Sequence, residues 1–146
     1  MENKDIRWHQ RFSNYKKAFA KLTAVAINCD LEKLTELEKD GLIQRFEYTY
    51  ELAWNTLQDL LRDNGYLDIA GPNPVLEQAM ADGYITDREG WKKMKKSREL
   101  TSHTYNSETA EDIAEDIIAR YYPLLKDLED KLEALRSGKQ NTFFSE

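Results

Sequence analysis

The segment "SRELTSHTY", residues 97–105, gathers three side chains that could act on a phosphate group. Arg98 carries a permanent positive charge, His103 can exchange a proton near neutral pH, and Tyr105 offers a hydroxyl. A guanidinium can hold two phosphate oxygens, and an imidazole beside it could deprotonate a ribose 2′-hydroxyl without a metal ion. The segment therefore predicts a phosphate-binding site or a metal-independent ribonuclease centre.

A structural interpretation of the same three residues stays open. His103 could cap the end of a helix, and Arg98 could form an ordinary surface ion pair. The ring of Tyr105 could pack over the loop, or its hydroxyl could bind a phosphate or be modified. No cysteine and histidine cluster has the spacing of metal ligands, so we expect no metal and no cofactor.

Positive charge is concentrated just before this segment. Lys92, Lys93, Lys95 and Lys96 lead into Arg98, although the whole chain has a formal charge of -6. Such an overall charge argues against sequence-independent binding of nucleic acid over a large surface. The local run of lysines nevertheless favours an anionic ligand, with Lys95 and Lys96 as phosphate-binding residues. The same run could instead be a solvated face that complements the dipole at a helix end.

Acidic residues with a tryptophan lie on an earlier predicted helix, in "RFEYTYELAW". Glu47 and Glu51 are one helical turn apart and share a face, and Trp54 follows three residues later. A carboxylate there could orient Arg98. Alternatively, the face is an exposed acidic ridge or an interface with another chain, in which Trp54 would be an anchor.

The first half of the chain has the apolar spacing of two helices. One helix is predicted over residues 5–28. The stretch "NCDLEKLTELEKDG" should interrupt the pattern at Asn28, Asp30 and Gly41, with a short turn of its own. A second helix should follow and end at Asn64-Gly65.

Two shorter helices are expected next. One should begin at Pro74 behind Asn73 and stop at Gly83. The other should begin near residue 87, because Thr86 and Glu89 have the spacing of a capping box.

The second of these helices should end between Leu100 and Ser102. In a continuous helix, Arg98 and His103 would point roughly 140° apart. The polar residues from 101 onward favour hydrogen bonds to nearby backbone, which would let the chain turn back toward Arg98. A long final helix should follow, capped by Ser107 or Thr109 and bent at Pro123.

These elements predict an all-α fold: an antiparallel four-helix up-and-down bundle with an extra short helix. A length of 146 residues suits one domain. We expect it to cover residues 1–137, with residues 138–146 as a flexible tail. No segment has the roughly 20 apolar residues of a membrane span, and the N-terminus lacks a signal peptide, so we expect a cytoplasmic protein.

The pattern Arg98-x4-His103-x-Tyr105, preceded by "FEYTYELAW" and followed by a capped long helix, resembles the HEPN superfamily. Over roughly residues 8–135 the chain looks most like the nucleotidyltransferase substrate-binding branch, which is related to the HepT toxins. The resemblance implies a homodimer whose two motifs face a shared cleft, and a minimal nucleotidyltransferase, encoded nearby, as the partner.

In the toxin branch, the residues at the positions of Arg98 and His103 cleave RNA without a metal. The tyrosine at the position of Tyr105 receives AMP, and the added anion would switch cleavage off. Family motifs often carry Asn or another small polar residue where this chain has Glu99, whose negative charge is expected to weaken an RNA phosphate site.

The leading prediction is a regulatory protein that pairs with a nucleotidyltransferase and binds a nucleotide or RNA phosphate. The alternative is a HepT-like endoribonuclease of a toxin–antitoxin pair. In that case His103 is the acid or base, Arg98 the electrostatic clamp and Tyr105 the control point. A third possibility is a helical bundle without chemistry.

Overall fold

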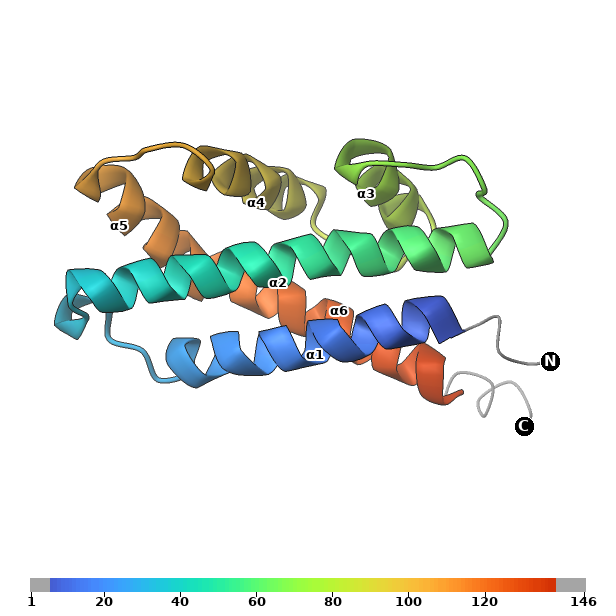
Figure 1. Ribbon diagram of the computed structural model, residues 1–146, viewed down its shortest axis with the longest axis horizontal. Helices are drawn as coiled ribbons and strands as arrows, with labels where there is room; N and C mark the ends of the chain where they lie inside the picture. Colours follow the sequence, from blue (N-terminus) through green and yellow to red (C-terminus); the bar gives the residue numbers. More distant parts are fainter. Residues whose placement is uncertain (1–5, 139–146) are drawn as a thin grey trace.

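The computed structural model describes residues 6–138, which fold into helices joined by short connections (Figure 1). A short 3-10 turn, Leu31–Lys33, precedes the second helix, and a π-helical segment, Ile117–Tyr121, joins the last two. The α-helices are α1 (Ile6–Ala26), α2 (Glu36–Asp63), α3 (Pro72–Ala81), α4 (Arg88–Thr101), α5 (Ser107–Asp116) and α6 (Tyr122–Ser137).

The long helices alternate in direction. In Figure 1, α1 and α4 run one way, while α2 and the continuous rod of α5 and α6 run the other. The short helix α3 lies beside α4 along α2. This arrangement confirms the predicted all-α class, the antiparallel four-helix bundle and the extra short helix.

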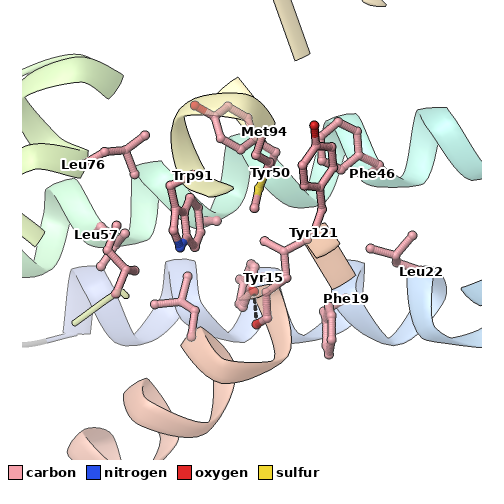
Figure 2. Close-up of a cluster of buried hydrophobic side chains, with 14 of the residues drawn as sticks. Tyr15, Phe19, Leu22, Phe46, Tyr50, Leu57, Leu76, Trp91, Met94 and Tyr121 are labelled. Atoms are coloured by element: carbon pink, nitrogen blue, oxygen red, sulfur yellow. Dashed lines mark hydrogen bonds between the residues drawn. The ribbon is translucent and has the colours of Figure 1, made fainter. Parts of the chain in front are cut away.

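The core lies between these helices and is rich in aromatic rings (Figure 2). The apolar residues that recur with the helical period on α1, from Trp8 to Ala26, are buried, and so are those on α2 from Phe46 to Leu61. Each fully buried large apolar side chain contributes roughly 1.5–3 kcal/mol relative to its exposed state. The periodic stripes therefore account for how the bundle closes.

One face of α4 is held closely against the π-helical segment. Ser97 and Tyr121 share a buried hydrogen bond of 2.6 Å between their hydroxyl oxygens, and the Tyr121 hydroxyl also donates to the Lys93 carbonyl at 3.2 Å. At the start of α4, Arg120 donates to both carboxylate oxygens of Asp87, at 3.0 and 3.2 Å. These contacts fix α4 at both its beginning and its middle.

The predicted helix boundaries need corrections in the first half of the chain. The helix predicted over residues 5–28 spans Ile6–Ala26 among the described residues. The short turn is present, but Gly41 does not interrupt the chain: it lies inside α2. A capping box between Thr35 and Glu38 starts α2 five residues before Gly41, and a glycine inside a long helix costs only about 1 kcal/mol.

The start predicted for the short helix is also wrong. The helix α3 begins at Pro72 rather than Pro74, and Gly71, with a φ of +90°, takes the place expected for Asn73. A proline in the first turn loses no helical hydrogen bond, so either proline satisfied the sequence pattern.

The predicted caps of the later helices are wrong as well. Asp87, not Thr86, caps α4: its side chain accepts from the Gly90 amide, and its φ is +65°. Asn106 caps α5 by accepting from the Thr109 amide at 2.8 Å, in place of Ser107 or Thr109.

Pro123 is the second residue of α6, just after the π-helical segment Ile117–Tyr121, and the predicted bend itself stays a prediction. Proline has no amide proton for the preceding turn, which favours such an irregularity. The predicted tail lies almost entirely in residues 139–146, outside the described range, so the division into residues 1–137 and 138–146 stays a prediction. Within residues 6–138, no helix has the length and apolar character needed to cross a bilayer.

Candidate functional site

The end of α4 is built by hydroxyl side chains. Thr101 donates to the Arg98 carbonyl at 2.9 Å, and Ser102 donates to the Glu99 carbonyl at 2.6 Å. The amide of His103 makes a tight-turn bond of 3.2 Å to the Leu100 carbonyl. The helix ends at Thr101, within the predicted range, and by the predicted mechanism.

The chain reverses direction immediately afterwards. Figure 1 shows the connection from α4 arching over to α5, which returns along the bundle. Arg98 thus lies in the last turn of α4, while His103 and Tyr105 lie in the connection before Asn106 caps α5. All three residues of the predicted motif belong to this one turn.

Arg98 faces the acidic residues of α2. Its Nε lies 3.2 Å from Oε2 of Glu51, and its Nη1 lies 3.8 Å from Oε2 of Glu47. The Arg98 side chain is 27% exposed. Its buried Nε–H does not have hydrogen-bond geometry toward Glu51, so the contact is an ion pair only. The two carboxylates hold the guanidinium without satisfying all of its donors.

Glu51 connects Arg98 to Trp54. The indole nitrogen of Trp54 donates to Oε1 of Glu51 at 3.2 Å, so each oxygen of this carboxylate has a different partner. Trp54 is partly buried and packs against the core. The tryptophan therefore positions Glu51, which in turn positions Arg98. An interface role for Trp54 stays a prediction.

A buried phenol missed by the sequence analysis lies beside this cluster. The hydroxyl of Tyr50, a residue that is 1% exposed, has no hydrogen-bond partner among the described residues. Burial raises the pKa of Tyr50, with further increases from the charges of Glu51 and Glu99 and an opposing effect of Arg98. The α2–α4 contact near Arg98 thus contains two buried polar atoms without hydrogen-bond partners.

Tyr105 is half-buried, and its ring packs against the core. It also lines a pocket of about 170 Å³ between the first turns of α2 and α5, together with Lys39 and Asp40. Burial and then the charges of Asp40 and Glu47 raise the pKa of Tyr105. Both effects favour the protonated hydroxyl over the phenolate.

Asp40 is a second residue that the sequence analysis missed. It lies seven positions before Glu47, which is two helical turns, so the two side chains share a face of α2. The seven-residue spacing is present in the sequence, but a predicted interruption at Gly41 separates Asp40 from the helix that carries Glu47.

His103 has an exposed side chain, and its ring forms no hydrogen bond or ion pair with residues 6–138. Its imidazole is thus accessible to a ligand. Lys95 and Lys96 do not share one pocket: Lys95 lines the groove between α3 and α4, and Lys96 lines the groove between α4 and α5. Lys95 also forms an ion pair with Glu99. This pair offsets the negative charge that was expected to weaken the site.

Comparisons with known proteins agree with this arrangement. The family described as "Nucleotidyltransferase substrate binding protein like" matches residues 10–134. A Haemophilus influenzae protein named "Probable ribonuclease HepT" is 32% identical over 74 residues, which are 48% of this chain and 51% of that relative. The chain therefore matches about half the length of this relative.

A solved structure extends the likeness to the fold. The crystal structure of a protein from Thermus thermophilus matches with a TM-score of 0.71 and 35% sequence identity. The match covers 81% of this chain and 98% of the other. The resemblance inferred from the motif and helix order is confirmed: this chain belongs to the nucleotidyltransferase substrate-binding-protein-like family.

Proposed function

We propose that this chain is the substrate-binding and regulatory partner of a minimal nucleotidyltransferase, and that its α4–α5 turn binds the phosphate of a nucleotide or RNA. The observation that carries the proposal is the position of Arg98 at this turn, ion-paired to Glu47 and Glu51 and close in sequence to the exposed His103. Family membership supports the partnership.

The geometry favours reversible binding over catalysis as the main role. Two carboxylates compete with any anion for Arg98, so phosphate binding must displace or share these ion pairs. A partly exposed ion pair contributes only about 0–1 kcal/mol, which a phosphate can offset through stronger charge-assisted hydrogen bonds. Arg98 is therefore oriented in advance while staying exchangeable.

Two copies of the chain complete the proposed assembly, with their α4–α5 turns facing one cleft. The homodimer rests on the family resemblance. A second Arg98 and a second His103 would then lie across the cleft from the first pair.

The test combines partner binding with ligand binding. Sedimentation of the purified chain with the nucleotidyltransferase encoded beside it should give a stable complex. Labelled ATP should bind the parent protein, and Arg98→Ala should weaken this binding about tenfold or more through loss of the charge-assisted contact. Lys17→Ala, on the exposed side of α1, is the control and should bind like the parent. No complex, or equal ATP binding by the Arg98→Ala variant, would refute the proposal.

A second candidate function is a HepT-like, metal-independent endoribonuclease. The named Haemophilus influenzae relative and the free, exposed imidazole of His103 favour it. The ribose 2′-hydroxyl would lose its proton to His103 and attack the adjacent phosphorus, and the 5′-oxygen would leave after it takes a proton from water. Arg98 would stabilise the charge that develops on the phosphate.

Control through Tyr105 belongs to this candidate. The Tyr105 oxygen would attack the α-phosphorus of ATP and pyrophosphate would leave. The partner enzyme must supply the base, because burial, followed by the charges of Asp40 and Glu47, raises the pKa of the phenol.

Incubation with RNA in the presence of a chelator separates the two functions. Under the nuclease candidate, the parent protein produces cyclic-phosphate ends and His103→Ala loses this activity by at least about a hundredfold. With partner and ATP, the parent gains the mass of AMP and Tyr105→Phe does not, whereas Tyr48→Phe, at an exposed position on α2, still does. Equal, negligible cleavage by parent and variant would remove the nuclease candidate.

A further inference from the structure

A second groove lies next to the Arg98 site. It runs between α3 and α4, which Figure 1 shows side by side along α2, and it encloses about 250 Å³. Its lining combines charged residues at the rim with apolar residues below: Asn73, Leu76, Glu77, Met80, Arg88, Trp91, Lys92 and Lys95. Neither the motif nor the family likeness assigns a role to it.

The charge of this groove is opposite to that of the whole protein. Arg88, Lys92 and Lys95 face one carboxylate, that of Glu77, whereas the chain has a formal charge of -6. Arg88 is ion-paired to Glu77 and Lys95 to Glu99, while Lys92 forms no ion pair with residues 6–138. The hydrogen bond from Arg88, followed by the charges of Arg88 and Lys92, lowers the pKa of Glu77. Lys92 therefore offers an anion a positive charge that no ion pair among the described residues offsets.

The cations of the groove continue into the Arg98 site. Arg88, Lys92, Lys95 and Arg98 are four, three and three positions apart, which keeps them on one side of α4. Ten residues of helix span roughly 15 Å. The row is therefore long enough to contact several successive phosphates of one strand.

The lower wall of the groove is apolar. Leu76 and Trp91 are almost fully buried, and Met80 is partly buried beside them. Sites for drug-sized ligands usually enclose roughly 300–1,000 Å³. At about 250 Å³ the groove is smaller than such sites, which favours a nucleotide that places only its planar base there. Its phosphate would have to remain at the basic rim.

The groove on the other side of α4 is larger but has the opposite charge balance. It encloses about 470 Å³, and Lys93 and Lys96 are outnumbered there by Asp112, Glu115 and Asp116. Lys93 is already ion-paired to Asp116. Repulsion from these acids disfavours a polyanion, so an extended strand leaving Arg98 is directed toward α3.

We propose that the α3–α4 groove is a subsite for single-stranded RNA. A short segment of the strand runs along α4 from Arg98, with its phosphates at Lys95 and Lys92 and one base against Leu76 and Met80. The subsite rests on the proposed phosphate binding at Arg98 and deepens it, because it makes a short RNA strand, rather than a mononucleotide, the preferred ligand.

The test compares two charge reversals of equal size. Lys92→Glu alters the groove, whereas Lys17→Glu makes the same change on the exposed side of α1; both residues are exposed, so both variants should fold. Fluorescence anisotropy would measure binding of a labelled five-nucleotide oligouridylate and of labelled AMP, with Arg98→Ala as a further variant. Thermal melting of each variant would establish that it is folded.

Lys92→Glu should weaken oligouridylate binding about tenfold and reduce the salt slope by about 1, because one phosphate contact is lost. It should change AMP binding less than twofold, and Lys17→Glu should resemble the parent for both ligands.

If Arg98→Ala loses binding while Lys92→Glu behaves like Lys17→Glu, the subsite is refuted and phosphate binding at Arg98 stands. If Lys92→Glu weakens AMP as much as the oligonucleotide, the groove binds a mononucleotide and the RNA subsite is refuted. If Arg98→Ala binds both ligands like the parent, the proposed function itself fails.

Discussion

Ser97 and Arg98 are neighbours in sequence but belong to two contrasting sides of α4. Ser97 is buried, and its partner Tyr121 uses its hydroxyl in two hydrogen bonds of 2.6 and 3.2 Å. Arg98 is partly exposed, and its two ion pairs, at 3.2 and 3.8 Å, leave the buried Nε without a hydrogen bond. Tyr50 on the same side has a buried hydroxyl with no partner among residues 6–138.

The contrast separates the residues that hold the fold from those that can bind a ligand. Satisfied buried hydrogen bonds keep a helix in one position, whereas incompletely satisfied polar groups cost stability and are retained where they serve another purpose. The contacts between α4 and Tyr121 provide a rigid base, and the Arg98 side remains available for exchange.

The largest expected change in the free energy of unfolding comes from adding a methyl group where α4 is tightly packed, on the side away from Arg98. In Gly90→Ala, the new methyl group would overlap a carboxylate oxygen of Asp87 and lie 2.6 Å from Cδ1 of Leu124. Asp87 is also held by Arg120, so it cannot move freely. The free energy of unfolding should fall by about 2–3 kcal/mol in urea denaturation.

Gly41→Ala is the matched control within α2, where the added methyl group meets no atom within 4 Å. It should stabilise the protein by about 0.5–1 kcal/mol, because alanine favours the helix. Equal effects of the two substitutions would contradict the proposed rigidity of this side of α4.

Removing single hydroxyls compares the two sides directly. Tyr121→Phe should lower the free energy of unfolding by about 1–2 kcal/mol, because Ser97 loses its partner in the core. Tyr50→Phe should leave stability unchanged or slightly higher, because it removes a buried group that has no hydrogen bond. Calorimetry of both variants would measure the difference in the free energy of unfolding. A larger loss of stability in Tyr50→Phe than in Tyr121→Phe would contradict the distinction between the two sides of α4.

The free energy of unfolding should fall at alkaline pH, because the buried phenol of Tyr50 resists ionisation. Burial raises the pKa of Tyr50, so above the usual value near 10 the unfolded state releases this proton and the folded state retains it. Stability contributed by the protonated form is complete below pH ~10 and declines as the pH rises. Between about pH 10 and 12, Tyr50→Phe should lose stability less steeply than the parent, by about 1.4 kcal/mol per pH unit. Parallel curves would show that Tyr50 ionises freely in the fold.

The smallest stability effect is expected at the Arg98 ion pairs. Glu47→Gln should change the free energy of unfolding by less than about 0.5 kcal/mol, because both partners are partly exposed. Oligouridylate binding should nevertheless tighten about two- to fivefold, since one competing charge is removed. Glu32→Gln, at an exposed position before α2, makes the same charge change and should not affect binding. A marked loss of binding in Glu47→Gln would show that this carboxylate supports the ligand.

Local sequence patterns are sufficient to predict that the helices form and where α4 ends. The apolar stripes have the helical period, and Thr101 and Ser102 bond to the backbone within three residues. The cap at Asp87 could not be predicted in this way. Its left-handed backbone is held by Arg120, which is 33 positions away, so the local Thr86 and Glu89 pattern was misleading.

The candidate site was predicted as a set of residue types, but not as a geometry. Glu47, Glu51 and Arg98 were named from their spacing, and the structure brings them together. The division of Lys95 and Lys96 between two grooves depends on where α3 and α5 pack, which no local pattern reveals. The sequence likewise does not reveal that the Tyr50 hydroxyl lacks a hydrogen-bond partner among residues 6–138, because Tyr50 simply continues a stripe of buried apolar residues.

The most direct test of phosphate binding at Arg98 is an NMR titration of the arginine Nε–H signals with oligouridylate. The Arg98 signal, assigned by its absence in Arg98→Lys, should shift with saturation, while the signal of Arg120, which is held by Asp87, should stay in place. Uridine, which lacks the phosphate, should shift neither. An Arg98 signal that does not move while the RNA is bound would contradict the account.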